Sequence, residues 1–274
     1  MKDEVERATG RRVTGARRVS GGCINDGMRV ELEGGDLAFV KTRADVPPDE
    51  YPSEAAALRW LAEPAAVNVP HVLGVSERVL ALEWIDEGSL TPDGAERLGR
   101  GLARMHAAGA ESFGGERPLR IGRLEIPNEP AQDWPTFYAE RRLLPLTTAV
   151  DATTRAAVER VASRVADLAG PAQPPSRLHG DLWSGNVLAD SSGEAWLIDP
   201  VAYGGHHEVD LAMLRLFGVS HAQRIEAAYE EITPLADGHE ERVGLWQLFP
   251  LLVHAALFGG HYASQVEQVA RRYL

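Results

Sequence analysis

Three polar residues in the C-terminal half of the chain have the types and the spacing that chemistry on phosphate requires. In the segment HGDLWSGN, Asp181 and Asn186 are five positions apart, and Asp199 follows thirteen positions after Asn186. This is the spacing of a catalytic loop, H-x-D-x-x-x-x-N, followed by a metal-binding Asp on the next strand. A carboxylate at Asp181 can orient a hydroxyl and accept its proton. The oxygens of Asn186 and Asp199 are the hard ligands that Mg²⁺ prefers, so the set predicts magnesium-dependent phosphoryl transfer to a hydroxyl.

Each of these residues also has a plain structural interpretation. Asp181 and Asn186 are common turn formers, and Asp199 could cap a strand ahead of Pro200. They occur together, however, on a strand–turn–strand pattern with apolar runs at 187–189 and 195–198 and a Ser-Ser-Gly turn at 191–193. Their joint occurrence at this spacing favours a kinase over separate structural roles.

A second pair of candidates lies in the N-terminal part of the chain. Lys41 ends an apolar strand-like run about twenty residues after a Gly-rich loop, and Glu54 opens the following helix. A strand Lys that holds nucleotide phosphates and is clamped by a helix Glu is the second half of the same machinery. Alternatively, Lys41 is a solvated edge charge and Glu54 stabilises the helix dipole. The complete order of loop, Lys, Glu, connector, catalytic loop and Asp favours the kinase interpretation.

The Gly-rich loop carries three further candidates. Gly21 and Gly22 could let backbone N–H groups approach phosphates, although the loop lacks a full G-x-G-x-x-G and could be a hairpin turn. Cys23 follows them, and we expect it to be exposed near Lys41, where a thiolate is favoured. Oxidation would then hold the loop away from ATP. The alternative for Cys23 is a small residue packed under the loop.

The connector near 83–90 is the candidate nucleotide hinge. Glu83, Trp84 and Ile85 would present backbone donors and acceptors to the edge of an adenine. The chain contains no Walker A sequence, G-x-x-x-x-G-K-[ST], which excludes a P-loop kinase.

Hydrophobic periodicity divides the chain into two parts around this connector. Short strand-like runs at 17–20, 28–32, 37–42, 71–75 and 79–83 precede it, together with one helix from Ser53 to Pro64. Helical patterns follow it, at about 92–109, 133–144, 151–169, 208–217, 221–232 and 240–272. We therefore expect an α+β protein of two lobes: residues 1–85 form a β-rich nucleotide-binding lobe with a small antiparallel sheet. Residues 86–274 form a larger helical lobe with the catalytic loop and the acceptor site.

Composition excludes several classes of function. The 274 residues include 28 Lys and Arg against 40 Asp and Glu, a net charge of −12, which disfavours nucleic acid as a partner. The single cysteine, Cys23, excludes internal disulfides and fits a reducing compartment. The N-terminus has no apolar signal segment, and no apolar stretch is long enough to span a bilayer. We expect a cytoplasmic protein with no membrane partner.

Longer strings of the sequence resemble a known family. HGDLWSGNVL, DPVAYGGHHEVDLAMLRLFG and HAALFGGHY are similar to the fructosamine-3-kinase (ketosamine-3-kinase) family, within the aminoglycoside-phosphotransferase-like branch of the protein-kinase-like fold. The SGGCIND loop, FVKT and EAAALRWLAE extend the likeness over nearly the whole chain. The resemblance implies phosphorylation, by ATP with Mg²⁺, of the 3-hydroxyl of fructosamine- or ribulosamine-type adducts, whose unstable product then loses the sugar. This amounts to deglycation.

The resemblance also implies roles for the candidate residues. By motif, it implies that Asp181 is the base and that Asn186 and Asp199 are the metal ligands. It also implies that Lys41 and Glu54 form the phosphate clamp. The adenine hinge would be Glu83, Trp84 and Ile85. Two departures, His207 in place of an Arg and Val219-Ser220 in place of a Gly and an aromatic residue, cast doubt on the acceptor preference rather than on the reaction.

Three residues are candidates for binding the acceptor. Trp183, two positions after Asp181, could stack on a sugar face or be a core aromatic. Glu208 and Asp210 open a predicted helix and could bind a cationic amine, or could serve only the helix dipole. The expected partner is a small ketosamine or a glycated lysine side chain. The chain itself is expected to be a monomer, or a dimer linked through oxidised Cys23.

Two other functions stay open. An aminoglycoside, choline or homoserine phosphotransferase of the same fold would share the phosphate machinery. Trp183 and the HHEVDLAM string favour the ketosamine branch over these. A nucleotide-binding regulator without catalysis would be expected to have lost Lys41, Asp181 or Asp199, and all three are present.

Overall fold

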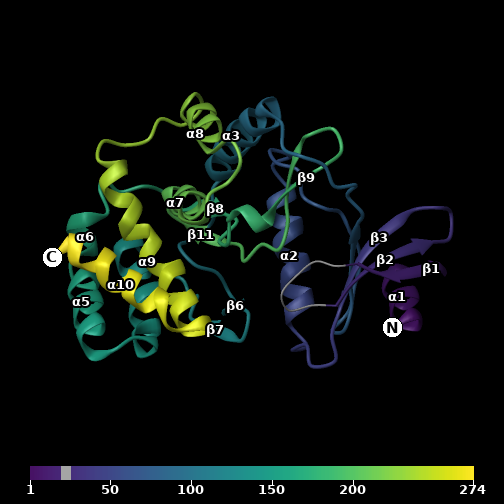
Figure 1. Cartoon of the computed structure of the whole chain (residues 1–274), viewed down its shortest axis with the longest axis horizontal. Helices are drawn as coiled ribbons and strands as arrows, with labels where there is room; N and C mark the ends of the chain where they lie inside the picture. The colour runs from purple at the N-terminus through teal and green to yellow at the C-terminus, as the bar shows by residue number, and fades with distance from the viewer. Residues whose placement is uncertain (20–25) are drawn as a thin grey trace.

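Apolar alternation in the first 85 residues produces a twisted antiparallel sheet. In the computed structural model, which describes residues 1–19 and 26–274, five strands of the described chain pair in the order β1-β2-β3-β5-β4 (Figure 1). Their bounds are β1 (Val13–Arg18), β2 (Asp26–Leu32), β3 (Leu37–Thr42), β4 (Val72–Val75) and β5 (Leu80–Glu83). Strand β3 lies between β2 and β5, and therefore Lys41, near its end, is held from both sides. This position fixes the lysine that the sequence singled out.

Two helices pack on this sheet. Helix α2 (Glu50–Ala62) buries Tyr51, Ala55, Leu58 and Leu61 between the sheet and the second lobe. Helix α1 (Lys2–Thr9) lies against β4, where a Cβ on Gly74 would collide with the backbone of Ala8. Sequence patterning did not predict α1, because in this short helix Val5 alone is buried.

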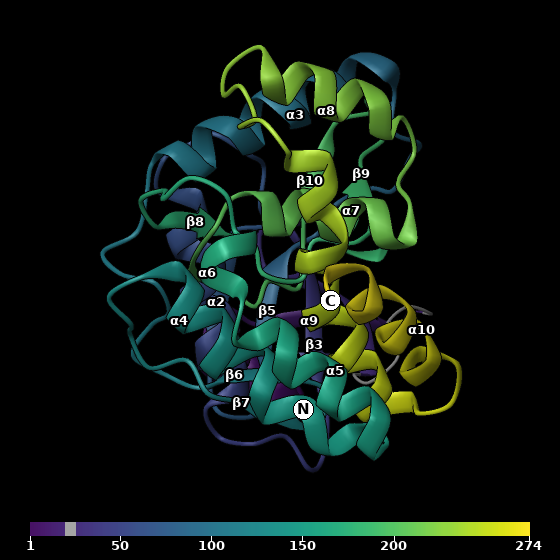
Figure 2. The same ribbon diagram turned by 90° about the vertical axis from the view of Figure 1, so that its left-hand side faces the viewer.

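The second lobe is mainly helical, as predicted, and its helices enclose a large apolar core (Figure 2). Thr91 caps α3 by accepting a hydrogen bond from the Gly94 N–H at 3.1 Å, and Pro92 takes the first helical position, as its sequence predicts. Figure 2 shows α3 and α8 side by side at the edge of the lobe. The helices are α3 (Pro92–Ala107), α4 (Trp134–Phe137), α5 (Ala152–Ala162), α6 (Val165–Leu168), α7 (Glu208–Phe217), α8 (Ala222–Glu230), α9 (His239–Phe258) and α10 (His261–Ala270).

Three small hairpin-like sheets complete the second lobe. The predicted strand–turn–strand is present as β9 paired with β10, and β8 pairs with β11. A further hairpin, β6 with β7, was not predicted, because strands of three residues leave little periodicity to detect. The strands are β6 (Leu119–Ile121), β7 (Leu124–Ile126), β8 (Ser176–Leu178), β9 (Val187–Ala189), β10 (Ala195–Leu197) and β11 (Tyr203–Gly205).

Three predicted helices are interrupted. The long one predicted at 240–272 breaks at Gly259 and Gly260, whose φ angles of +69° and +53° belong to a region that favours glycine. The one predicted at 133–144 continues from α4 as a π-helix (Tyr138–Leu143) and a 3₁₀-helix (Leu144–Ala149). The one predicted at 151–169 divides into α5 and α6. None of the helices in the described part of the chain combines the length and apolarity needed to cross a membrane.

Candidate active site

Lys41 stands at the centre of an ion-pair cluster that joins the two lobes. Its Nζ lies 2.7 Å from Glu54 Oε1 on α2 and 2.5 Å from Asp199 Oδ1 in the second lobe. The side chain is almost completely buried. Burial alone lowers the pKa of Lys41, but the negative charges of Glu54 and Asp199 outweigh it and raise that pKa above its usual value. The ammonium therefore stays charged, and the three predicted residues meet in one place.

Asp181 and Asn186 form the second part of the site. The Asn186 Nδ2 donates to Asp181 Oδ2 at 3.0 Å and to the Asp181 backbone carbonyl at 2.8 Å. Burial raises the pKa of Asp181 to about 7, and the hydrogen bond from Asn186 offsets only part of this effect. A half-buried carboxyl with a pKa near neutrality is suited to exchanging a proton with a hydroxyl.

Asp199 and Asn186 fit a cation in their chemistry. Since the Asn186 Nδ2 faces Asp181, the amide has its Oδ1 to offer, and Asp199 offers a carboxylate. The backbone of Ile198 donates to the Asn186 carbonyl at 3.1 Å, which ties the segment before Asp199 to the catalytic loop. Asp199 has a φ of +54°, a left-handed conformation that Asp tolerates better than bulkier residues. Hard oxygens of this kind are the ligands that Mg²⁺ takes.

A buried acid anchors the catalytic loop. Asp210 accepts hydrogen bonds from the backbone N–H groups of His179 at 2.8 Å and Gly180 at 3.0 Å, and its Oδ2 lies 3.1 Å from His106 Nε2. His179 in turn donates from Nε2 to the carbonyl of Ile198 at 3.0 Å. Gly180 has a φ of +82°, and a Cβ there would collide with the carbonyl of Val201. The loop before Asp181 is therefore fixed on both sides.

These contacts correct one prediction and identify a residue that the sequence analysis missed. Asp210 was considered for binding a cationic amine, but its carboxylate is buried and already accepts several hydrogen bonds, so it positions the loop. The sequence did not single out His106. His106 lies with Leu102 and Met105 on the inward face of α3. A polar residue on an otherwise apolar helix face is the sequence signal that could have identified it.

Glu208 was also a candidate for the amine, and the structure places it elsewhere. Its carboxylate accepts from Arg242 Nε at 2.9 Å and Nη2 at 2.6 Å, and from Trp246 Nε1 at 2.7 Å. The side chain is buried. Burial tends to raise the pKa of Glu208, but the bonds from Arg242 and Trp246 hold it below its usual value. Glu208 is thus a structural anion with a fixed partner.

Trp183 lies at the surface beside the base. Its side chain is 37% exposed, which excludes a core position. The indole meets the ring of Phe217 edge-on, with centroids 5.9 Å apart, and covers Gly185, where a Cβ would collide with it. The indole is therefore available to a ligand next to Asp181.

Backbone hydrogen bonds within the sheet reduce the number of N–H groups that the predicted hinge can offer to an adenine. The N–H of Glu83 donates to the His71 carbonyl at 2.8 Å, and the N–H of Trp84 donates to the Leu37 carbonyl at 3.3 Å. These two donors are used within the sheet, and an adenine would have to find its N–H donor at Ile85 or beyond. The Gly-rich loop predictions at Gly21, Gly22 and Cys23 lie outside the described residues.

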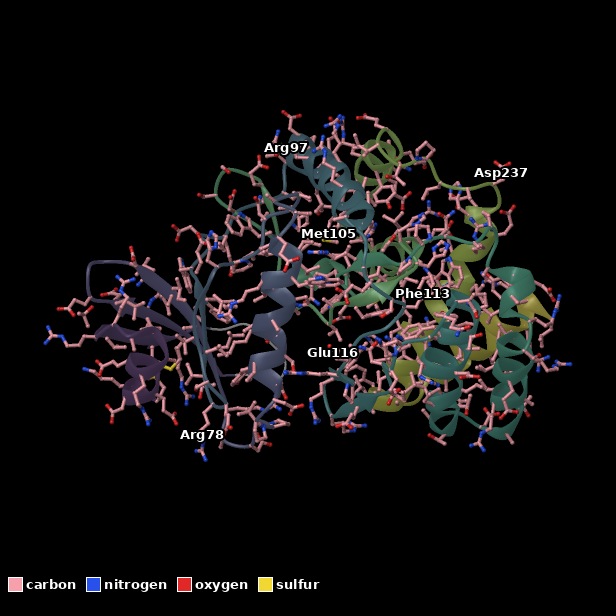
Figure 3. All side chains as sticks on the ribbon, turned by 180° about the vertical axis from the view of Figure 1, so that it is seen from behind. Arg78, Arg97, Met105, Phe113, Glu116 and Asp237 are labelled. Atoms are coloured by element: carbon pink, nitrogen blue, oxygen red, sulfur yellow. The ribbon has the colours of Figure 1, made fainter. Side chains whose placement is uncertain are left out.

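A cleft of about 1130 Å³ lies between α2 and the second lobe. Lys41, Asp181 and Asp199 all line it, so that the base and the ion-pair cluster share one space. Figure 3, seen from behind, shows Glu116 on the segment that faces α2 across this cleft. The volume is ample for a small-molecule substrate.

The chain is similar in sequence to proteins of one family over its whole length. The family model described as fructosamine kinase matches residues 1–274. A probable ketoamine kinase of Synechocystis is 35% identical, with 100% of this chain and 96% of the relative covered. The chloroplastic protein-ribulosamine 3-kinase of Arabidopsis thaliana is 34% identical, with 96% of this chain and 83% of the relative covered.

Solved structures agree with these sequence matches. A Thermobifida fusca crystal structure, assigned as a fructosamine-3-kinase, has a TM-score of 0.94 at 43% identity and covers 100% of this chain and 98% of its own. A macrolide 2'-phosphotransferase from Brachybacterium faecium has a TM-score of 0.65 at 18% identity, with 99% of this chain and 96% of its own covered. At that identity the likeness shows the fold alone, and it agrees with the predicted two-lobed α+β fold.

Proposed function

Since the chain belongs to the fructosamine kinase family, we propose that it transfers the γ-phosphoryl group of ATP to the 3-hydroxyl of a ketosamine, a ketose joined through carbon 1 to an amine. The observation that carries the proposal is the shared cleft. Lys41, Glu54, Asp199 and Asp181 line this space together, and Asn186 is hydrogen-bonded to Asp181. We assign residues 1–85 to nucleotide binding and residues 86–274 to catalysis and acceptor binding.

Asp181 orients the acceptor in this mechanism. Its carboxylate accepts a hydrogen bond from the 3-hydroxyl and takes the proton as the oxygen bonds to phosphorus. The hydrogen bond from Asn186 fixes the carboxylate, and the anchoring of the loop by Asp210 keeps it in place. The raised pKa of Asp181, about 7, makes its carboxylate a stronger base than that of an ordinary Asp, while a substantial fraction of it is ionised at neutral pH.

Lys41 and Asp199 act on the phosphates. The ammonium of Lys41 is held by Glu54 and can contact phosphate oxygens while that pair stays intact. Asn186 and Asp199 would hold Mg²⁺, which neutralises charge on the phosphates when it is bound. Asp199 pairs with Lys41 and would also bind Mg²⁺. The two positive charges that act on the phosphates, the Lys41 ammonium and Mg²⁺, would therefore lie near one another.

The acceptor on this proposal is a small ketosamine or a glycated lysine side chain, and removal of the sugar would follow from instability of the product. A cytoplasmic location is proposed with it. Phosphorylation of aminoglycosides, choline or homoserine is the weaker candidate, because relatives that phosphorylate other acceptors share only 13–18% identity with this chain. A catalytically silent regulator is not favoured, because the ion-pair cluster and the base are assembled.

A substrate panel tests the proposal. We would measure ADP formation with ribulosyl-lysine and fructosyl-lysine against kanamycin and choline, with ATP and Mg²⁺ in each case. Turnover on the ketosamines and none above background on the others is the expected result. A preference for kanamycin or choline would overturn the ketosamine assignment and leave the kinase fold standing.

A further inference from the structure

Neither of the two acids that the sequence suggested for the amine of the acceptor is available to bind it. A ketosamine carries a secondary ammonium, and carbons 1 to 3 alone separate its nitrogen from the hydroxyl that must reach Asp181. The charge therefore has to lie close to the base. Glu208 and Asp210, the acids that sequence reasoning considered for it, are buried and engaged by Arg242 and by the catalytic loop.

A row of aromatic rings lies beside the base instead. We define the aromatic ledge as Phe217, His254, Phe258 and Tyr262, from the ends of α7 and α9 and the start of α10. The His254 ring has its centroid 4.8 Å from Phe217, 5.6 Å from Phe258 and 4.9 Å from Tyr262. Phe258 is 67% exposed, so a ligand could contact its ring.

The ledge is continuous with the base on two sides. Trp183 meets Phe217 edge-on, which joins the ledge to the catalytic loop. A small cavity, about 10 Å³, is lined by Asp181 and His254 together, with apolar groups such as Met213 and Val253 around them. It has room for about one water molecule, so an acceptor would rest across its mouth. From there it would contact Asp181 and the ledge at once.

The hydrogen bonding of His254 fixes which of its two nitrogens can accept a hydrogen bond. Its Nδ1 lies 2.8 Å from the carbonyl oxygen of Pro250, and a carbonyl can only accept. The proton is therefore on Nδ1, and the neutral ring has a lone pair on Nε2. Burial lowers the pKa of His254, in keeping with a neutral ring at physiological pH.

We propose that the aromatic ledge binds the amine side of the acceptor, with the secondary ammonium against the faces of Phe258 and Tyr262 and one of its N–H groups donating to His254 Nε2. Aromatic faces attract ammonium groups through their quadrupole. The aliphatic chain that carries the amine would continue over Phe258 toward solvent. This inference rests on the proposed function and adds to it a preference for charged, N-alkyl ketosamines over uncharged ones.

Substitutions at the exposed end of the ledge provide the test. The acceptors are ribulosyl-Nα-acetyl-lysine and the same compound with its ketosamine nitrogen acetylated, which removes the charge. The variants are Phe258→Ala, Phe258→Leu, which keeps the apolar contact without the ring, and His254→Asn, whose amide can still donate to the Pro250 carbonyl. Ile232→Ala is the control, an exposed apolar residue outside the ledge.

We expect both Phe258 variants to raise KM for the charged acceptor by about two- to fivefold, and His254→Asn to raise it by about tenfold. The KM for ATP, the KM for the acetylated acceptor and the thermal midpoint should match those of Ile232→Ala. A wild-type KM in Phe258→Leu, or equal shifts for both acceptors, overturns the inference. Wild-type enzyme that phosphorylates neither compound overturns the proposed function itself, before any variant is compared.

Discussion

Asp210→Asn is the substitution that most sharply separates positioning of the catalytic loop from stability. The carboxylate accepts from two backbone N–H groups, of His179 and Gly180, and lies within hydrogen-bond distance of His106. An amide has one accepting oxygen, so its NH₂ would face at least one of these donors. Losing a charge-assisted bond and opposing a buried donor should lower the free energy of unfolding by about 2–4 kcal/mol.

The same change should slow catalysis beyond its effect on folding. His179 and Gly180 precede Asp181 directly, and a displacement of the base by about 1 Å costs on the order of 10²-fold in rate. We therefore expect kcat per folded molecule to fall by about 10²-fold, with KM for ATP little changed. Urea unfolding gives the folded fraction, and steady-state ADP release at a temperature where the variant is folded gives the rate.

Glu208→Gln is a matched control for this experiment. Glu208 is also a buried carboxylate in the first turn of α7, and its removal leaves Arg242 without its anion, which should destabilise the fold to a similar degree. Its contacts are with Arg242 and Trp246 rather than with the catalytic loop. Its kcat per folded molecule should stay within about twofold of wild type. A wild-type kcat in Asp210→Asn, or an equal loss in Glu208→Gln, would refute the positioning role.

Three further predictions concern Asp181, Asp199 and the two buried histidines His206 and His207. Asp181→Asn keeps the shape of the loop but removes the proton acceptor, so kcat should fall by about 10²–10⁴-fold while calorimetry shows ATP binding unchanged; near-normal turnover would contradict the assignment. Asp199→Ala removes a carboxylate ligand, so both Mg–ATP affinity and rate should drop, whereas unchanged affinity would return Asp199 to a structural role. Burial lowers the pKa of His206 to about 3 and of His207 to about 4, against 6.5 for an ordinary histidine. Between pH 4 and 6.5 the unfolded chain thus binds more protons than the folded one. The free energy of unfolding should therefore decrease as the pH is lowered from 6.5 to 4, by as much as about 2 kcal/mol per pH unit. Urea unfolding at several pH values checks this, and a flat profile in that window would be the contrary result.

Local patterns predicted the parts of the site that depend on short-range order. The spacing of Asp181, Asn186 and Asp199 follows from one strand–turn–strand, and the structure has that hairpin at β9 and β10. The position of Lys41 follows from its strand, because apolar alternation fixes β3. The capping residue Thr91 and its neighbour Pro92 fixed the start of α3 for the same reason.

The features of the site that the sequence did not predict depend on contacts between residues far apart in the chain. Glu208 looks like an available acid at a helix start, and its partner Arg242 lies 34 residues further along the chain. Asp210 likewise meets His106 across 104 residues. No local pattern identifies such partners. The aromatic ledge has the same origin, since Phe217 and His254 come from separate helices that tertiary packing brings together.

The central claim is that this chain phosphorylates the 3-hydroxyl of a ketosamine through Asp181. The measurement that tests it most directly is phosphorus NMR of the product formed from ribulosyl-lysine, ATP and Mg²⁺, with wild-type enzyme and with Asp181→Asn in parallel. We predict a new phosphomonoester signal coupled to the proton on carbon 3, formed with wild type and nearly absent with the variant. A phosphate on another carbon, or equal product from both enzymes, would contradict the account.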